Sequence, residues 1–271
     1  MKLAVAQINP MLGNVEKNKR KMISYIENAI KKGIELVVFP ELSLTGYLLE
    51  DLTFDVAGIP IEFYELSKKI SILFGGIEES RSYYYYNSAF YLENGRLQHT
   101  HRKVYLPTYG LFDEGRYLKP GNKIKAFDTK FGRFGILICE DAWHISNSYI
   151  LSMDGADYVF TLANSPSRGA QKSKLSSNHT WDEMMKTYSK LLTSFYIFAH
   201  RVGYEDGVNF FGGSSVYSPN GDLLSKAKNF QEEMIVVDLD KRDLRRARIN
   251  NPVMRDENLE LVLRSLNKII E

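Results

Sequence analysis

Short apolar runs of strand length recur along the whole chain, and this repetition limits the fold more than any other feature. They cover residues 3–8, 36–39, 72–77, 83–92, 135–139, 158–162, 198–202, 214–218 and 234–238. Between several of them lie stretches with the apolar spacing of an α-helix, at residues 14–30, 62–70, 145–153 and 180–195. Strands that alternate with helices in this way predict an α/β fold.

Turn residues refine this prediction. Asn14 is placed to cap the first helix, and Gly33 is a stop signal after it. Asn94-Gly95 and Asn220-Gly221 each separate two strand-like runs, and Asn-Gly readily adopts the positive φ angles of a tight hairpin. Helical crossovers mixed with hairpins predict two mixed sheets flanked by helices.

Composition restricts the class of protein. With 44% apolar residues in 271, the chain can fill a core, and we expect one domain over 1–271 with a charged helical tail at 241–271. The net charge of +2 argues against a nucleic acid partner, and no apolar run approaches the ~20 residues of a membrane helix. The N-terminus resembles a strand rather than a signal peptide, and there is one cysteine, so we expect a cytoplasmic protein.

Three reactive side chains follow apolar runs. Glu41 comes directly after Phe39-Pro40, Lys103 stands before a loop rich in Pro, Gly and Tyr, and Cys139 ends the run that begins at Gly135. Taken singly, each has an ordinary explanation as a surface charge or a small buried thiol. Sites in open α/β sheets are built at strand ends, however, and a carboxylate, an amine and a thiol complement one another chemically.

These three segments, in this order, resemble the Glu, Lys and Cys motifs of the nitrilase, or carbon-nitrogen hydrolase, superfamily. The resemblance extends from about residue 3 to 238. Within the superfamily the chain is most similar to the glutaminase domain of glutamine-dependent NAD synthetases. The segments that carry this likeness are 41–47, 50–52, 106–114 and 138–143.

The resemblance implies a four-layer α-β-β-α sandwich and a Glu41-Lys103-Cys139 triad. Cys139 would attack the carbonyl carbon of a small amide, and Lys103 would favour the thiolate and stabilise the oxyanion. Glu41 would serve as general base and acid. A backbone N–H after Cys139, that of Glu140, is a second candidate oxyanion donor. This chemistry requires neither a metal nor an organic cofactor.

Four further residues are candidates for supporting roles. The resemblance implies that Glu114 positions Lys103 or the substrate and that Tyr109 contacts the substrate. Trp143 is placed to wall the pocket, and Arg168 to bind a substrate carboxylate through paired hydrogen bonds. A solvated charge explains Glu114 or Arg168 equally simply, and plain packing explains Tyr109.

The chain also departs from the NAD synthetases. It contains no Ser-Gly-Gly-x-Asp-Ser pyrophosphate loop and ends soon after the hydrolase part, so we expect that it does not carry out adenylation itself. The polar stretch 167–181 looks longer than the usual glutaminase loop, which puts glutamine in doubt as the substrate.

Among possible substrates, we expect glutamine-like and other ω-amides first and N-carbamoyl amines second. Nitriles are the least expected substrates, because Cys139-Glu140-Asp141 resembles the amide-cleaving branch. The alternatives are an ammonia-supplying subunit of a separate synthetase and a non-catalytic scaffold.

Other patterns have simpler explanations. His99 and His101 form an H-x-H pair, but no third metal ligand is apparent nearby. The tyrosines at 83–86 are explained by strand packing, and the arginines at 242–248 by a solvated or intersubunit helix. We expect a homodimer or a higher homo-oligomer, because the superfamily commonly pairs subunits and the tail needs a surface to pack against.

Overall fold

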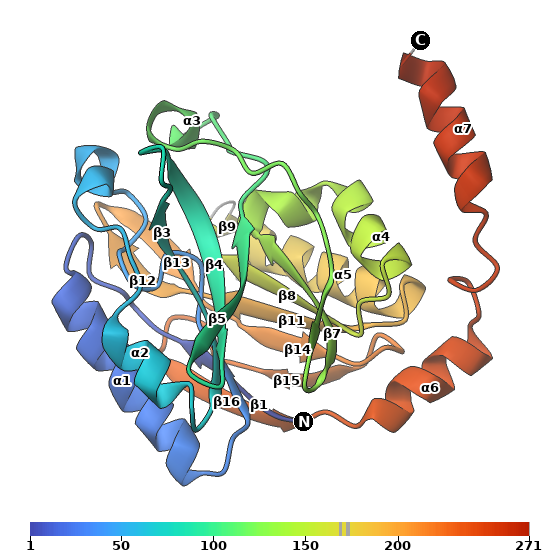
Figure 1. The fold of residues 1–271 in the computed structure, drawn as a ribbon, viewed down its shortest axis with the longest axis horizontal. Helices are drawn as coiled ribbons and strands as arrows, with labels where there is room; N and C mark the ends of the chain where they lie inside the picture. The colour runs from blue at the N-terminus through green and yellow to red at the C-terminus, as the bar shows by residue number, and fades with distance from the viewer. Residues whose placement is uncertain (168–169, 172–173, 271) are drawn as a thin grey trace.

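The computed structural model describes residues 1–167, 170–171 and 174–270, with residues 170–171 and 174–176 described by their backbone alone. Two six-stranded mixed sheets form its centre (Figure 1). The first has the order β16 (Glu233–Asp238), β1 (Lys2–Gln7), β2 (Leu36–Val38), β3 (Ser71–Glu79), β4 (Tyr85–Glu93) and β5 (Arg96–Arg102). The second has the order β15 (Leu223–Lys226), β14 (Ser215–Tyr217), β11 (Phe195–His200), β8 (Tyr158–Ala163), β7 (Gly132–Ile138) and β6 (Phe127–Thr129).

Each sheet has three parallel strands at its centre and antiparallel strands outside them. The parallel strands are β1, β2 and β3 in one sheet and β7, β8 and β11 in the other. Two small pairs lie apart from these sheets, β9 (Ala170–Gln171) with β10 (Lys174–Leu175) and β12 (Val202–Glu205) with β13 (Val208–Phe211).

The helices are α1 (Val15–Lys31), α2 (Ile61–Leu66), α3 (Glu114–Tyr117), α4 (Ile145–Met153), α5 (Ser176–Leu191), α6 (Lys241–Asn250) and α7 (Leu259–Ile270), with 3-10 turns η1 (Glu50–Phe54) and η2 (Cys139–Trp143). The helices α1 and α2 cover the outer face of the first sheet and α4 and α5 that of the second, which gives the expected α-β-β-α layers (Figure 1). None of the helices in the described part of the chain is both long and apolar enough to cross a bilayer.

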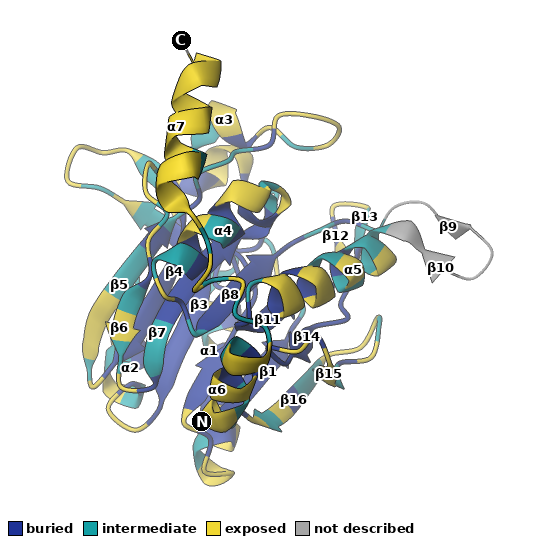
Figure 2. Cartoon of the chain, turned by 90° about the vertical axis from the view of Figure 1, so that its right-hand side faces the viewer, coloured by how far each residue is buried: buried dark blue, intermediate teal, exposed yellow. Residues whose placement is uncertain are grey.

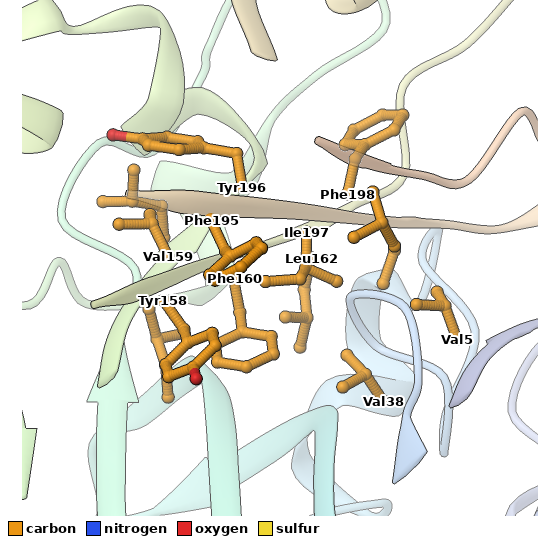
Figure 3. Packing of buried hydrophobic residues seen from close by; sticks show 14 of the residues in the cluster. Val5, Val38, Tyr158, Val159, Phe160, Leu162, Phe195, Tyr196, Ile197 and Phe198 are labelled. Atoms are coloured by element: carbon orange, nitrogen blue, oxygen red, sulfur yellow. The ribbon is translucent and has the colours of Figure 1, made fainter. Parts of the chain in front are cut away.

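The core follows from the alternation of side chains along the strands. On β1, Leu3 and Val5 belong to the large cluster shared by both sheets, whereas Ala4 and Ala6 pack on the opposite face with residues of α1 such as Met22. Figure 3 shows side chains of the shared cluster from both sheets. A sheet buried on both faces explains why its strands are continuously apolar.

Several predicted elements are confirmed. The helix predicted at 14–30 is α1, where the Asn14 side chain accepts a hydrogen bond from the Lys17 N–H at 3.1 Å. The helix predicted at 145–153 is α4. Both Asn-Gly hairpins are present, and Asn94 and Gly95 have φ angles of 52° and 75°.

Other boundaries were wrong. The helix predicted at 62–70 ends at Leu66, and the helix predicted at 180–195 is α5, which ends at Leu191. Thr193 then has a φ of 46°, and this left-handed residue turns the chain into β11, which begins at Phe195. The strand predicted at 198–202 is split between β11 and β12, and the strand predicted at 83–92 begins at Tyr85.

The tail predicted at 241–271 forms two helices that differ in burial. In α6, Leu244 and Ala247 are buried against the body. In α7, no described residue is buried, and the helix stands away from the sheets (Figures 1 and 2). Leu263 and Leu266 of α7 are 62% and 52% exposed, so its apolar face is open to solvent.

Candidate active site

The sheet topology brings three reactive side chains to strand ends. Strand β5 is antiparallel to β4, which is antiparallel to β3, so β5 runs in the same direction as β2. Glu41 follows β2, Lys103 follows β5 directly, and Cys139 follows β7 in the second sheet. Glu41 is fully buried, and Lys103 and Cys139 are 1% and 8% exposed. Ionisable groups this deeply buried need partners.

Glu41 is held by hydrogen bonds from three directions. Its Oε1 accepts from Lys103 Nζ at 2.9 Å and from Asn87 Nδ2 at 2.8 Å. Its Oε2 accepts from the main-chain N–H of Asn164 at 2.7 Å. A Cβ at position 75 would lie 2.8 Å from Glu41 Cα, so only glycine lets β3 approach this segment so closely. The carboxylate is therefore fixed in orientation.

Lys103 lies between two carboxylates. Its Nζ donates to Glu41 Oε1 and, at 2.5 Å, to Glu114 Oε1. Burial disfavours the ammonium, but the negative charges of Glu114 and Glu41 outweigh this effect and raise the pKa of Lys103 well above its ordinary value. Lys103 is thus a buried, fixed cation.

Glu114 begins the short helix α3 and is 8% exposed. The oxygen that binds Lys103 also accepts a hydrogen bond from the Tyr47 hydroxyl at 2.5 Å. Burial raises the pKa of Glu114 to about 7, against the lowering effect of Lys103, and Glu41 adds to the rise. The cluster therefore contains a carboxyl group that titrates near neutral pH.

Cys139 lies at the sharp turn between β7 and η2. Its φ of 45° is unusual for a residue with a side chain, and such a conformation costs on the order of 1–3 kcal/mol. Burial and the charge of Glu41 raise the pKa of the thiol well above its ordinary value, although Lys103 lowers it. Lys103 thus favours the thiolate, as expected, but its effect is outweighed and the resting thiol is protonated. Attack by the sulfur therefore requires a base that takes the proton.

Asp141 connects this turn to the segment that carries Lys103. Its Oδ1 accepts from the backbone N–H groups of Val104 and Tyr105 at 2.9 and 3.0 Å. Its Oδ2 accepts from the Ile138 N–H at 3.0 Å and contacts His101 Nε2 at 2.9 Å. Because Asp141 is fully buried, these contacts fix Cys139 relative to Lys103.

The remaining predicted residues lie nearer the surface. The Tyr109 hydroxyl donates to Glu140 Oε2 at 2.9 Å, and Tyr109 is 52% exposed. Trp143 is 45% exposed and packs edge-on against Trp181 with ring centroids 5.5 Å apart. Arg168 lies outside the described residues.

His99 and His101, the H-x-H pair of the sequence, both contact neighbouring side chains. His101 binds Asp141, and His99 stacks on Phe127 with ring centroids 3.9 Å apart. Burial lowers the pKa of His99 to about 4, and His101 and Lys125 add to this effect. His99 is therefore neutral at pH 7.

Sequence reasoning missed the residues that hold the three reactive groups in place: Tyr47, Asn87, His101, Asp141 and Asn164. Tyr47 and Asp141 stand inside the segments that carried the family resemblance, so a signal for them was present. Asn87 and Asn164 contact Glu41 from 46 and 123 residues away, and nothing in the local sequence marks such contacts.

Comparison with known proteins agrees with this architecture. Residues 2–249 match the model of the carbon-nitrogen hydrolase family. The glutamine-dependent NAD(+) synthetase of Thermotoga maritima is 33% identical over 93% of this chain, and the match covers 44% of that protein. The chain therefore spans less than half the length of this relative.

Two further relatives match over almost their whole length. A nitrilase of Pyrococcus abyssi is 29% identical over 97% of this chain and 100% of that protein. The crystal structure of a carbon-nitrogen hydrolase from Helicobacter pylori superposes with a TM-score of 0.87, covering 100% of this chain and 98% of that one at 23% identity. This chain belongs to the carbon-nitrogen hydrolase family, within the nitrilase superfamily.

Proposed function

We propose that this chain hydrolyses a small carboxamide to a carboxylic acid and ammonia through a thioester on Cys139. The observation that carries the proposal is the 2.9 Å contact between Glu41 Oε1 and Lys103 Nζ. Both side chains are buried, and both affect the pKa of Cys139. A fixed base can take the thiol proton and a fixed cation can stabilise the oxyanion, so this arrangement is suited to attack by the sulfur on a carbonyl carbon.

The first half of the reaction forms the thioester. Glu41 takes the proton of the Cys139 thiol as the sulfur attacks the carbonyl carbon. The negative charge then develops on the carbonyl oxygen, where the Lys103 ammonium and the Glu140 backbone N–H stabilise it. When the tetrahedral intermediate collapses, the C–N bond breaks and Glu41 returns the proton to the departing ammonia.

The second half releases the acid. Glu41, again a carboxylate, takes a proton from water as the water oxygen attacks the thioester carbonyl. The C–S bond breaks, the acid leaves, and the proton returns to the sulfur. Glu114 remains beside Lys103 throughout and keeps it charged. No step calls for a metal or an organic cofactor.

Within this reaction class, glutamine-like and other ω-amides are our first choice of substrate. The 33% identity to an enzyme that bears glutamine in its name supports this choice. The alternatives are an N-carbamoyl amine, which the same three groups would cleave, and glutamine hydrolysis that supplies ammonia to a separate synthetase. A non-catalytic scaffold is the alternative outside enzymes, and the complete Glu41-Lys103-Cys139 set argues against it.

Ammonia release from a panel of carboxamides, N-carbamoyl amines and nitriles tests the proposal. We expect release from the carboxamides by the wild type and none by Cys139→Ala. Release that persists in Cys139→Ala would contradict the proposed nucleophile. Release from nitriles or carbamoyl amines alone would move the chain to those branches, and no release from any compound would favour the scaffold or a partner-dependent enzyme.

We also propose that the chain assembles into at least a homodimer. The apolar residues of α7 lie on a helix that stands away from the body (Figure 1) and is exposed along most of its length (Figure 2). A second copy of the chain would cover this face. Nucleic acid and membrane partners are not part of the proposal.

A further inference from the structure

A buried ion pair lies outside the cluster around Cys139. Arg201 Nη1 is 2.6 Å from Glu205 Oε2, and the two residues are 0% and 5% exposed. Arg201 directly follows β11, and Glu205 ends β12. Burying two charges costs several kcal/mol each in lost hydration, so a pair of this kind contributes little to stability by itself. Its other contacts indicate what it does.

The second oxygen of Glu205 binds the loop that carries Tyr47. Glu205 Oε1 accepts hydrogen bonds from the main-chain N–H groups of Tyr47 and Leu48, both at 2.8 Å. Gly46 next to them has a φ of 80°, and a Cβ there would lie 2.9 Å from Glu205 Oε2 and 2.7 Å from Leu12 Cα. The loop backbone thus packs directly on the carboxylate.

Arg201 fixes the position of that carboxylate. Its Nη2 donates to Asn9 Oδ1 and to the Pro10 carbonyl, both at 3.2 Å. Its guanidinium carbon lies 4.3 Å from the centroid of the Phe210 ring. The guanidinium is therefore held on three sides, and Glu205 is aligned by a group that is itself immobilised.

The side chain of Tyr47 leads from this anchor to the reactive cluster. Its hydroxyl donates to Glu114 Oε1, the same oxygen that accepts from Lys103 Nζ. Tyr47 is 8% exposed, and burial and Glu114 raise the pKa of its hydroxyl well above the ordinary value, so it remains a donor. A continuous series of contacts thus joins Arg201 to Lys103.

We propose that Glu205, supported by Arg201, is a positioning residue for the proposed hydrolysis. It anchors the backbone at Tyr47, so that the hydroxyl fixes Glu114 and Glu114 fixes the Lys103 ammonium beside Cys139. The catalytic part of this inference rests on the proposed function, and the anchoring part does not. Glu205 and Tyr47 lie 158 residues apart in sequence.

A double-mutant cycle on thiol reactivity tests the coupling. Cys139 is the only cysteine, so the intact mass of the protein reports its alkylation by iodoacetamide without background. We expect Glu205→Gln and Tyr47→Phe each to slow alkylation by about tenfold, which corresponds to ~1.4 kcal/mol. The double variant should be no slower than Tyr47→Phe alone, because both changes break the same series of contacts. A double variant about a hundredfold slower would overturn the coupling.

Hydrogen exchange tests the anchoring without reference to the reaction. In Glu205→Gln the side chain has one oxygen acceptor instead of two, so it cannot accept both from Arg201 and from the Tyr47 and Leu48 N–H groups, and the peptide covering residues 42–49 should exchange faster. Tyr47→Phe keeps the backbone contacts and should leave exchange unchanged. Unaltered exchange in Glu205→Gln would overturn the anchoring. Arg133→Gln removes two other ion pairs, with Asp128 at 3.1 Å and with Asp154 at 2.8 Å, and serves as the control that changes neither readout. Lys103→Met separates the two parts of the inference. If Cys139 were alkylated as fast in this variant as in the wild type, the proposed function would be contradicted, whereas the hydrogen-exchange result would still test the anchoring of the Tyr47 backbone by Glu205.

Discussion

Glu41 Oε1 lies 2.9 Å from Lys103 Nζ, and neither side chain is more than 1% exposed. In the proposed reaction the thiol must lose its proton as the sulfur attacks, because the pKa of Cys139 is raised well above its ordinary value, and Glu41 serves as the base. The pair therefore carries both the proton transfer and the charge stabilisation of the proposed reaction.

Replacing the base tests this division of labour. Glu41→Gln keeps the size of the side chain but cannot accept the thiol proton, so we expect kcat for amide hydrolysis to fall by roughly 10²–10⁴-fold. Steady-state ammonia release measures the effect. Glu65→Gln, on an exposed glutamate paired with Lys68, is the control that should retain full activity. A Glu41→Gln enzyme with nearly wild-type kcat would exclude Glu41 as the base.

The raised pKa of Glu114 predicts a pH effect on stability. The folded protein holds this proton up to about pH 7, whereas an ordinary glutamate in the unfolded chain releases it near pH 4.5. Stability from this group is therefore complete below about pH 4.5 and is lost as the pH rises through about 7. Glu114→Gln cannot ionise, so its free energy of unfolding should fall less than that of the wild type between pH 5 and pH 8.

Urea unfolding at those two pH values measures the difference. Tyr47→Phe keeps the carboxyl group of Glu114 but removes a hydrogen bond that lowers its pKa, so the stability of this variant should still fall between the two pH values. Parallel pH profiles for the wild type and Glu114→Gln would show that Glu114 has no raised pKa.

Asp141 predicts a large loss of stability from a small change. In Asp141→Asn an NH2 group replaces one oxygen and faces backbone N–H groups that donate to the carboxylate in the wild type, either that of Ile138 or those of Val104 and Tyr105. Leaving buried donors unpaired costs about 1–3 kcal/mol each. We therefore expect the free energy of unfolding to fall by about 2–4 kcal/mol, measured in urea. Glu140→Gln, at the half-buried neighbour, keeps an oxygen that can accept from the Tyr109 hydroxyl and should change it by less than about 0.5 kcal/mol.

Should the two variants instead prove equally stable, Asp141 would not be the contact that joins the Cys139 turn to the Lys103 segment. Thiol alkylation of Asp141→Asn adds a second readout, because a displaced Cys139 should react at a different rate from the wild type.

The exposed face of α7 predicts the state of assembly. Sedimentation should give particles of at least twice the 31.1 kDa chain mass at micromolar concentration. Leu263→Glu with Leu266→Glu places charges on the apolar face and should shift the protein toward monomer, whereas Arg264→Glu between them should not. Wild-type particles of a single chain mass would contradict the proposed homodimer.

Local patterns predicted much of the framework, because its signals are local. The Asn14 cap, the Asn94-Gly95 turn and the reactive residues at strand ends are all visible in short windows. The missed strands show the limit of such patterns. Residues 96–102 of β5 are largely polar, since this strand lies at the edge of its sheet, and only pairing with β4 establishes it.

The supporting contacts of the site lie beyond a single sequence for another reason. Asn164, Glu205 and Asn87 act across distances of 123, 158 and 46 residues, and each is an ordinary polar residue in its own segment. Nothing in the sequence near Phe195 signals that a left-handed Thr193 ends α5 early. The contacts of Asn164, Glu205 and Asn87 arise only when segments far apart in the sequence come together in the fold.

Trapping the intermediate tests the central claim most directly. The wild type is mixed with the carboxamide that it hydrolyses fastest, quenched in acid within the first turnover, and digested for mass spectrometry. We predict that the peptide carrying Cys139 gains the mass of the substrate less ammonia, that the adduct is labile to hydroxylamine, and that Cys139→Ala shows neither adduct nor ammonia. Ammonia release without any adduct on Cys139, and undiminished in Cys139→Ala, would contradict the account.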